Sequence, residues 1–165
     1  IPRGCRDNTG GLKRILIANY CDIDTITHSV SDPIGQITAV TMSNSAKFYE
    51  FVPAKNSSNA VENIQANSTN GTLGFEQVVT LNFAKNEQEK RNAVYEMCVS
   101  DIVAIVEDYN GTYWLYGEEN GMEVTGGNSG TGTALSDMNG WTITLTAYEK
   151  DPADTVDPSI IAGLL

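Results

Sequence analysis

The sequence lacks most of the residues from which catalytic sites are commonly built. It has one histidine, His28, in the segment THSVSD, and no nucleophile motif such as GxSxG accompanies it. Ser-His-Asp and Cys-His sites need a histidine that can shuttle a proton near neutral pH. With a single histidine outside any motif of that kind, we expect a protein that is not an enzyme.

Cysteines and long apolar runs are also scarce. Cys5, Cys21 and Cys98 form no CxxC pair, and their odd number argues against a disulfide framework of the secreted type. We therefore expect assembly in a reducing, intracellular place. No run approaches the roughly 18 consecutive apolar residues of a membrane-spanning helix, so no membrane contact is expected.

Three short motifs that suggest ligand sites lack their essential neighbours. Asp22 and Asp24 offer hard oxygens to Mg²⁺ or Ca²⁺, but the other ligands of a calcium loop do not follow. The segment GGNSGTGT (126–133) lacks the Gly-Lys-Ser/Thr ending of a phosphate loop, and we expect a flexible connection there. Glu118 and Glu119 are adjacent, so on a strand they point to opposite faces. No metal or other cofactor is expected.

Basic residues nearly disappear from the second half of the chain. Residues 1–91 hold nine Lys or Arg and nine Asp or Glu, whereas residues 92–165 hold twelve acidic residues and one basic residue, Lys150. The net charge of -11 therefore belongs to the second half. Such a surface repels phosphate, which argues against specific DNA or RNA binding. It is either an ordinary solubilising face or a surface that DNA passes without adhering.

Strand patterns are abundant, and they are clearest between Asp101 and Tyr148. Residues 102–106 are apolar without a break, which predicts a strand buried on both faces. Residues 141–148 alternate between apolar and polar, which predicts one buried and one wetter face. Asn-Gly pairs at 110–111, 120–121 and 139–140 favour tight hairpin turns.

The earlier part of the domain adds strands and one helix. Strands are predicted at 12–19, 36–42, 47–52 and 75–83. Residues 87–99 change to a helical period, with Asn86 as the cap and Val94, Met97 and Cys98 facing the sheet. These elements predict one mainly β domain over residues 12–150, with seven or eight strands arranged as hairpins.

Three segments fall outside this pattern. Residues 1–11 read as a polar N-terminal arm, and the Asn- and Ser-rich residues 55–73 read as a long loop available to a neighbouring chain. Residues 151–165 read as a C-terminal arm whose aliphatic end packs on its own domain or docks on another subunit. The candidate interface residues in that arm are Ile160, Ile161, Leu164 and Leu165.

The order of these elements resembles the tail-tube family of tailed bacteriophages, including the ring and adaptor proteins between portal and tail. The run from YWLYGEENGMEV through GTGTALSDMNGWTITLTAYEK is most similar to these proteins, especially to the ring proteins of crAss-like phages of gut Bacteroides. The resemblance covers most of the chain and lies in its pattern. It implies an antiparallel β-sandwich or partly open barrel of two sheets with one flanking helix.

The resemblance also implies a function. Such proteins form homo-oligomeric rings of six or twelve subunits, or stacked tubes, that serve as conduits for DNA in the virion. The expected partners are further copies of the chain, neighbouring tail, portal or ring proteins, and double-stranded DNA as passing cargo. Assembly would take place in the cytoplasm of the bacterial host. The candidate channel-lining acids are Glu107, Asp108, Glu118, Glu119, Glu123 and Asp137.

A different class of function is a monomeric β-sandwich that binds carbohydrate. Trp114 and Trp141, together with Tyr113 and Tyr116, offer aromatic rings on which sugars stack. The competing interpretation places these rings in the core or in an interface. Size measurement separates the two functions, because a binding module stays monomeric whereas a ring protein assembles.

Overall fold

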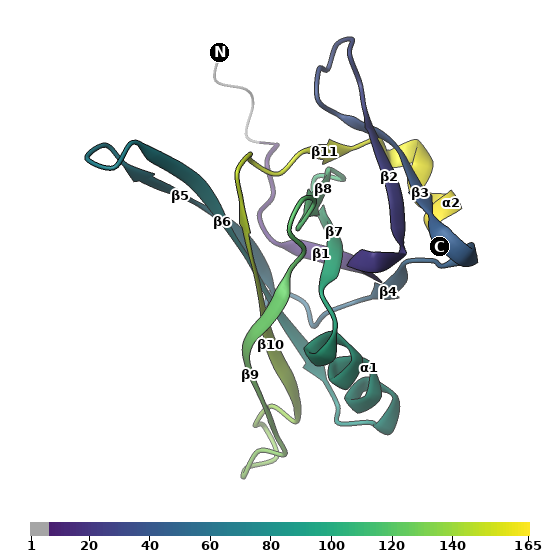
Figure 1. Ribbon diagram of the computed structural model, residues 1–165. Helices are drawn as coiled ribbons and strands as arrows, with labels where there is room; N and C mark the ends of the chain where they lie inside the picture. The colour runs from purple at the N-terminus through teal and green to yellow at the C-terminus, as the bar shows by residue number, and fades with distance from the viewer. Residues whose placement is uncertain (1–6) are drawn as a thin grey trace.

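The structure, a computed structural model, describes residues 7–165. Its strands form two sheets (Figure 1), one with the order β2-β3-β11-β8-β7-β1-β4 and one with the order β5-β6-β10-β9. The strand pairs are antiparallel except for a single parallel bridge between β11 and β3. This arrangement confirms the predicted mainly β fold of two sheets with a flanking helix.

The strands, in chain order, are β1 (Leu12–Asn19), β2 (Ile23–His28), β3 (Ile37–Met42), β4 (Tyr49–Phe51), β5 (Asn59–Asn67), β6 (Thr72–Ala84), β7 (Ile102–Asp108), β8 (Tyr113–Tyr116), β9 (Glu123–Gly130), β10 (Gly140–Glu149) and β11 (Thr155–Val156). The helices are α1 (Gln88–Val99), α2 (Ile161–Leu164) and three short 3-10 turns, η1 (Tyr20–Asp22), η2 (Ser43–Ser45) and η3 (Pro158–Ile160). Within residues 7–165, no helix is long and apolar enough to cross a membrane.

The seven-stranded sheet separates two hydrophobic cores. On β7, Ile102, Ala104 and Val106 face the core shared with the four-stranded sheet, whereas Val103 and Ile105 face the second core. All five are buried, as the unbroken apolar run predicts. The edge strand β2 and its neighbour β3 curl over the second core (Figure 1), so this sheet covers both sides of that core.

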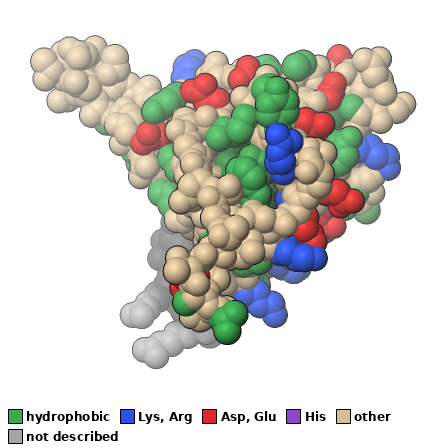
Figure 2. All heavy atoms as spheres, turned by 90° about the horizontal axis from the view of Figure 1, so that it is seen from below, with side chains coloured by type: hydrophobic (Ala, Val, Ile, Leu, Met, Phe, Trp, Pro, Cys, Tyr) green, Lys and Arg blue, Asp and Glu red, His purple; other side chains and the backbone are tan. Residues whose placement is uncertain are grey.

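Residues 55–73, predicted to be a loop, instead contain most of one arm of a long β-hairpin. β5 pairs with β6 from Asn59 opposite Thr80 to Asn67 opposite Thr72. The far half of the hairpin projects from the body (Figure 1), and its tip forms a protrusion of uncharged groups in Figure 2. A strand with water on both faces needs no alternation of apolar and polar residues, which is why its sequence resembles a loop.

The three Asn-Gly pairs occupy three different kinds of connection. Gly111 lies in the tight turn between the paired strands β7 and β8, as predicted, with φ 80°. Gly121 (φ 75°) lies where the chain leaves the seven-stranded sheet after β8 and enters the four-stranded sheet as β9, so no hairpin forms there. Asn139 ends the longer connection between β9 and β10. The glycine-rich residues 126–130, predicted to be a loop, belong to β9.

Helix α1 lies at one end of the sandwich and closes the core between the two sheets (Figure 1). Val94 and Met97 are buried, as predicted, but Cys98 is exposed. The predicted Asn86 cap is also wrong: the helix begins after Glu87, and the Asn86 side chain donates to the carbonyl oxygen of Gly130 at 3.0 Å. Apolar side chains remain visible at this end of the molecule (Figure 2).

The predicted C-terminal arm folds back onto its own domain. Residues 155–156 add strand β11 between β3 and β8, and the chain then ends in α2. Ile161 and Leu164 are buried in the second core, and Ile160 and Leu165 pack against it. The C-terminal helix is also bonded to the residue before β4, because the amide of Phe48 donates to the carbonyl of Leu164 at 2.9 Å.

Of the two alternatives for the aliphatic end of residues 151–165, these contacts show packing on its own domain within the single chain, so the segment is not a free arm. Buried large aliphatic side chains stabilise a fold by about 1.5–3 kcal/mol each, and the domain itself supplies the partners for these four. At the other end, residues 1–6 of the predicted N-terminal arm lie outside the described residues. Residues 7–11 are exposed, and the amide of Thr9 donates to Asn110 Oδ1 at 2.8 Å.

Candidate functional site

The six predicted channel-lining acids do not lie together. Glu107 was predicted to line a channel, but it is only 3% exposed and is therefore not available to one. Its carboxylate accepts hydrogen bonds from Lys13 Nζ, at 2.6 Å, and from Arg14 Nε. Arg14 also donates to Glu50 at 2.7 Å and to the Tyr113 hydroxyl at 2.9 Å. This network joins β1, β4, β7 and β8 and is structural.

The network also sets the charge of Glu107. Burial alone raises the pKa of this carboxyl, but the hydrogen bonds from Lys13 and Arg14 outweigh burial and leave the pKa below its usual value. The same contacts raise the pKa of Lys13, first through its hydrogen bond to Glu107. Glu107 therefore stays ionised at neutral pH inside the fold.

Two further acids of the set hold turns in place. Asp108 accepts from the backbone amides of Asn110 and Thr112, at 2.8 and 2.9 Å, in the β7–β8 turn. Asp137 accepts from the amides of Thr133 and Ala134 at 2.8 and 2.7 Å, and these bonds lower the pKa of Asp137. These turn contacts account for an acidic residue at both positions, so neither position needs a role in repelling DNA.

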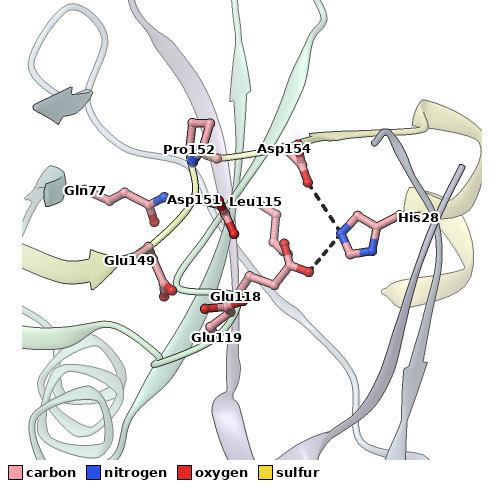
Figure 3. Close-up of a pocket in the computed structure, with 10 residues that line it drawn as sticks. His28, Gln77, Leu115, Glu118, Glu119, Glu149, Asp151, Pro152 and Asp154 are labelled. Carbon is pink, nitrogen blue, oxygen red and sulfur yellow. Dashed lines mark ion pairs between the residues drawn. The ribbon is translucent and has the colours of Figure 1, made fainter. Parts of the chain in front are cut away.

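Glu118 lies in a pocket that no sequence motif indicates (Figure 3). His28 Nε2, at the end of β2, is 2.9 Å from a Glu118 oxygen and 3.4 Å from an Asp154 oxygen. Gln77, Glu119, Glu149 and Asp151 also line this pocket of about 150 Å³. Residues 28, 118 and 154 come from β2, from the connection after β8 and from the segment before β11, so only the tertiary fold brings them together.

Burial and mutual repulsion raise several carboxyl pKa values around this pocket. The pKa of Glu118 is raised first by burial and then by Asp154, Glu149 and Glu119, while His28 opposes the rise. The pKa of Asp154 is raised first by burial, again against His28. Glu149 is buried too, and burial raises its pKa although Asn120 donates to it.

A second feature of functional interest is the outer face of the four-stranded sheet, the face turned away from the core. It presents mainly Thr, Asn and Gln side chains, with Val61 and Val78 as an apolar pair. Glu76 and Glu123 are acidic members near the same end. The four strands contain no Lys, Arg or His. This surface is therefore polar and weakly acidic.

Several polar groups of that face are bonded to one another. Glu76 accepts from Asn63 at 3.4 Å, Gln65 at 3.2 Å and the Tyr148 hydroxyl at 3.2 Å. The hydroxyl of Thr142 donates to Asn82 at 2.6 Å, and the hydroxyls of Thr125 and Thr146 lie 2.8 Å apart. Donors that are engaged within the sheet are less available to a passing ligand.

The aromatic residues predicted as a sugar platform are mostly turned inward. Tyr113 and Tyr116 are 8% and 7% exposed. Burial raises the pKa of Tyr116 to about 12, with Glu62 and Asp108 adding to the rise. Trp114 and Trp141 are half-buried and pack against the core between the sheets. No stacking surface is formed by these four rings.

The remaining predicted residues lie at or near the surface. Glu119 and Glu123 are exposed, and Asp22 accepts from the Asn19 side chain at 3.2 Å while Asp24 is exposed. Comparison of the chain with family models, with curated proteins and with solved structures found no match.

Proposed function

We propose that the chain is a structural protein of a tailed-phage virion that assembles into a homo-oligomeric ring or stacked tube through which DNA passes. The observation that carries the proposal is the open face of the β5-β6-β10-β9 sheet. It is a mostly polar surface, interrupted by the Val61–Val78 pair, and its four strands carry no basic residue. We assign this face to the wall of the channel.

A channel for DNA has to avoid holding its cargo. Basic side chains bind phosphate strongly, because each contact releases condensed counterions. The outer face has no such side chain, and some of its hydrogen-bonding groups are engaged with one another, as in the set around Glu76. Acidic groups such as Glu76 and Glu123 repel the duplex weakly, over about 8 Å at physiological salt.

The edges of the same sheet suit self-assembly. β5 and β9 each have one side without a strand partner among the described residues. Open edges pair readily with further strands, and closing a sheet into a ring removes them. We propose that β9 of one subunit lies beside β5 of the next.

The projecting hairpin supplies a further contact. Ile64 and Leu73 are 69% and 61% exposed, on the hairpin face that continues the core-facing side of the sheet. Side chains on that face are buried where the hairpin crosses the body, as Val79 shows. We propose that a neighbouring subunit or ring covers the exposed part. Tail, portal and ring proteins are the further partners.

The hairpin gives the test. The double variant Ile64→Ser with Leu73→Ser should fold as the wild type does but shift sedimentation velocity profiles from assemblies towards monomer. Leu135→Ser is the matched control, because Leu135 is a fully exposed aliphatic on the β9–β10 connection, away from the hairpin. The proposal fails if the wild type sediments as a 17.8 kDa monomer at high concentration.

The carbohydrate-binding alternative loses its main support. It rests on a platform of Tyr113, Tyr116, Trp114 and Trp141, and these rings serve the two cores instead.

A further inference from the structure

The pocket around His28 presents a mixed set of metal-binding atoms. One imidazole nitrogen and the carboxylate oxygens of Glu118 and Asp154 all lie within 4.8 Å of one another. The three side chains are 36%, 26% and 40% exposed, so each reaches the pocket while keeping part of its surface in water. Imidazole nitrogen and carboxylate oxygen are common ligands of Zn²⁺ and related divalent ions.

Within the protein, the two carboxylates of this set share a single hydrogen-bonding partner. Among residues 7–165, His28 Nε2 is the polar partner found for the side chains of both Glu118 and Asp154. That nitrogen carries at most one hydrogen, which points at one oxygen and not at both. At least one of the two carboxylates therefore receives no hydrogen bond from the protein and faces the pocket, where water or a cation can reach it.

We infer that His28, Glu118 and Asp154 form a binding site for a divalent transition-type cation of the Zn²⁺ class. Ligand atoms at about 2.0–2.2 Å from a tetrahedral ion lie about 3.3 Å from one another. The observed separations of 2.9 and 3.4 Å are already close to this spacing. The ion takes the place of the shared hydrogen and bonds all three ligands, and the open side of the pocket leaves its fourth position to water.

The nitrogen ligand decides the class of ion. Ca²⁺ and Mg²⁺ prefer sites made wholly of oxygen, whereas imidazole favours Zn²⁺, Co²⁺ and Ni²⁺. Glu119, Glu149 and Asp151 line the same pocket and add negative charge around a bound cation. The site joins β2, the connection after β8 and the segment before β11. A bound ion therefore links the C-terminal segment to the rest of the domain.

The test uses the full chain after treatment with a chelator. Titration calorimetry with Zn²⁺ should show one site, and Co²⁺ should give the intense visible absorption of a tetrahedral complex. The variants His28→Gln, Glu118→Gln and Asp154→Asn should each weaken Zn²⁺ binding by at least about tenfold. Saturating Zn²⁺ should raise the Tm of the wild type by roughly 5–10 °C.

Glu119→Gln is the matched control, because it removes one charge from the same pocket without removing a proposed ligand. It should bind Zn²⁺ within about twofold of the wild type. Circular dichroism shows whether each variant is folded, and Glu118→Gln and Asp154→Asn keep the size of the side chain. The proposal is overturned if the wild type and the ligand variants bind alike, or if Ca²⁺ competes with Zn²⁺ at equal concentration.

Discussion

Replacing Glu107 by Gln tests how far a buried charge network stabilises this fold. The carboxylate is 3% exposed and receives Lys13 and Arg14, so the variant keeps the shape but removes the charge that holds both cations. Removing one partner of a fully buried ion pair costs about 3–5 kcal/mol. Here the cost is smaller, because Lys13 is 54% exposed and Arg14 retains Glu50 and Tyr113.

These contacts lead us to expect a loss of about 1.5–3 kcal/mol in the free energy of unfolding. Urea unfolding at one fixed protein concentration measures it, with Glu123→Gln, an exposed acid, as the control that changes stability by less than about 0.5 kcal/mol. Equal stability of Glu107→Gln and the wild type would refute the structural role of the network.

The pH dependence of the free energy of unfolding provides a second test with the Glu107→Gln variant. The folded-state pKa of Glu107 lies below its unfolded value, so its contribution is complete above the unfolded pKa, which is about 4.3. The contribution is lost as the pH falls through the lower folded-state pKa. The difference between wild type and Glu107→Gln should therefore be constant from pH 7 to about pH 5 and shrink below pH 4.

Three further outcomes follow from burial and close approach. Leu164→Ala should lower the free energy of unfolding by about 2–4 kcal/mol, whereas Leu135→Ala, at an exposed position, should change it by less than about 0.5 kcal/mol in urea titrations. Gly140→Ala should lower the free energy of unfolding by roughly 2–3 kcal/mol in the same assay, because the added Cβ would lie 2.0 Å from a carbonyl oxygen of β6. Gly126→Ala is the control, because this glycine lies on the neighbouring strand β9 and has open space around it. The raised pKa of Glu149 makes the folded state take up its proton first, so the wild type should gain stability relative to Glu149→Gln as the pH falls from 7 towards 5, as unfolding at a series of pH values would show.

The elements that could be predicted from the sequence are those whose side chains are mostly buried in the cores or show a clear buried stripe. β1 and β7 carry dense apolar runs because both cores touch them, and α1 shows its buried stripe at Val94 and Met97. β5 was missed because water surrounds much of it, and β2 was missed because its short run IDTITH lies at a sheet edge. In both cases the neighbouring strand defines the element more than its own pattern does.

The candidate site was less predictable than the fold. His28, Glu118 and Asp154 are separated by 90 and 36 positions and share no spacing motif. Their meeting depends on β11 returning to the sheet, and β11 is only two residues long, too short to show a strand pattern in the sequence. The charge imbalance of the second half was real, but five of the six candidate acids divide among an ion-pair network, two turns and a pocket, and Glu123 alone lies on the outer face of the four-stranded sheet.

Cryo-electron microscopy of the assembled protein shows which surface of the subunit faces the channel. We expect closed rings or stacked tubes in which the face of the β5-β6-β10-β9 sheet bearing Glu76 and Tyr148 lines the axis, with β9 beside β5 of the next subunit. Single 17.8 kDa particles, or a ring whose inner wall is basic or is built from the seven-stranded sheet, would contradict it.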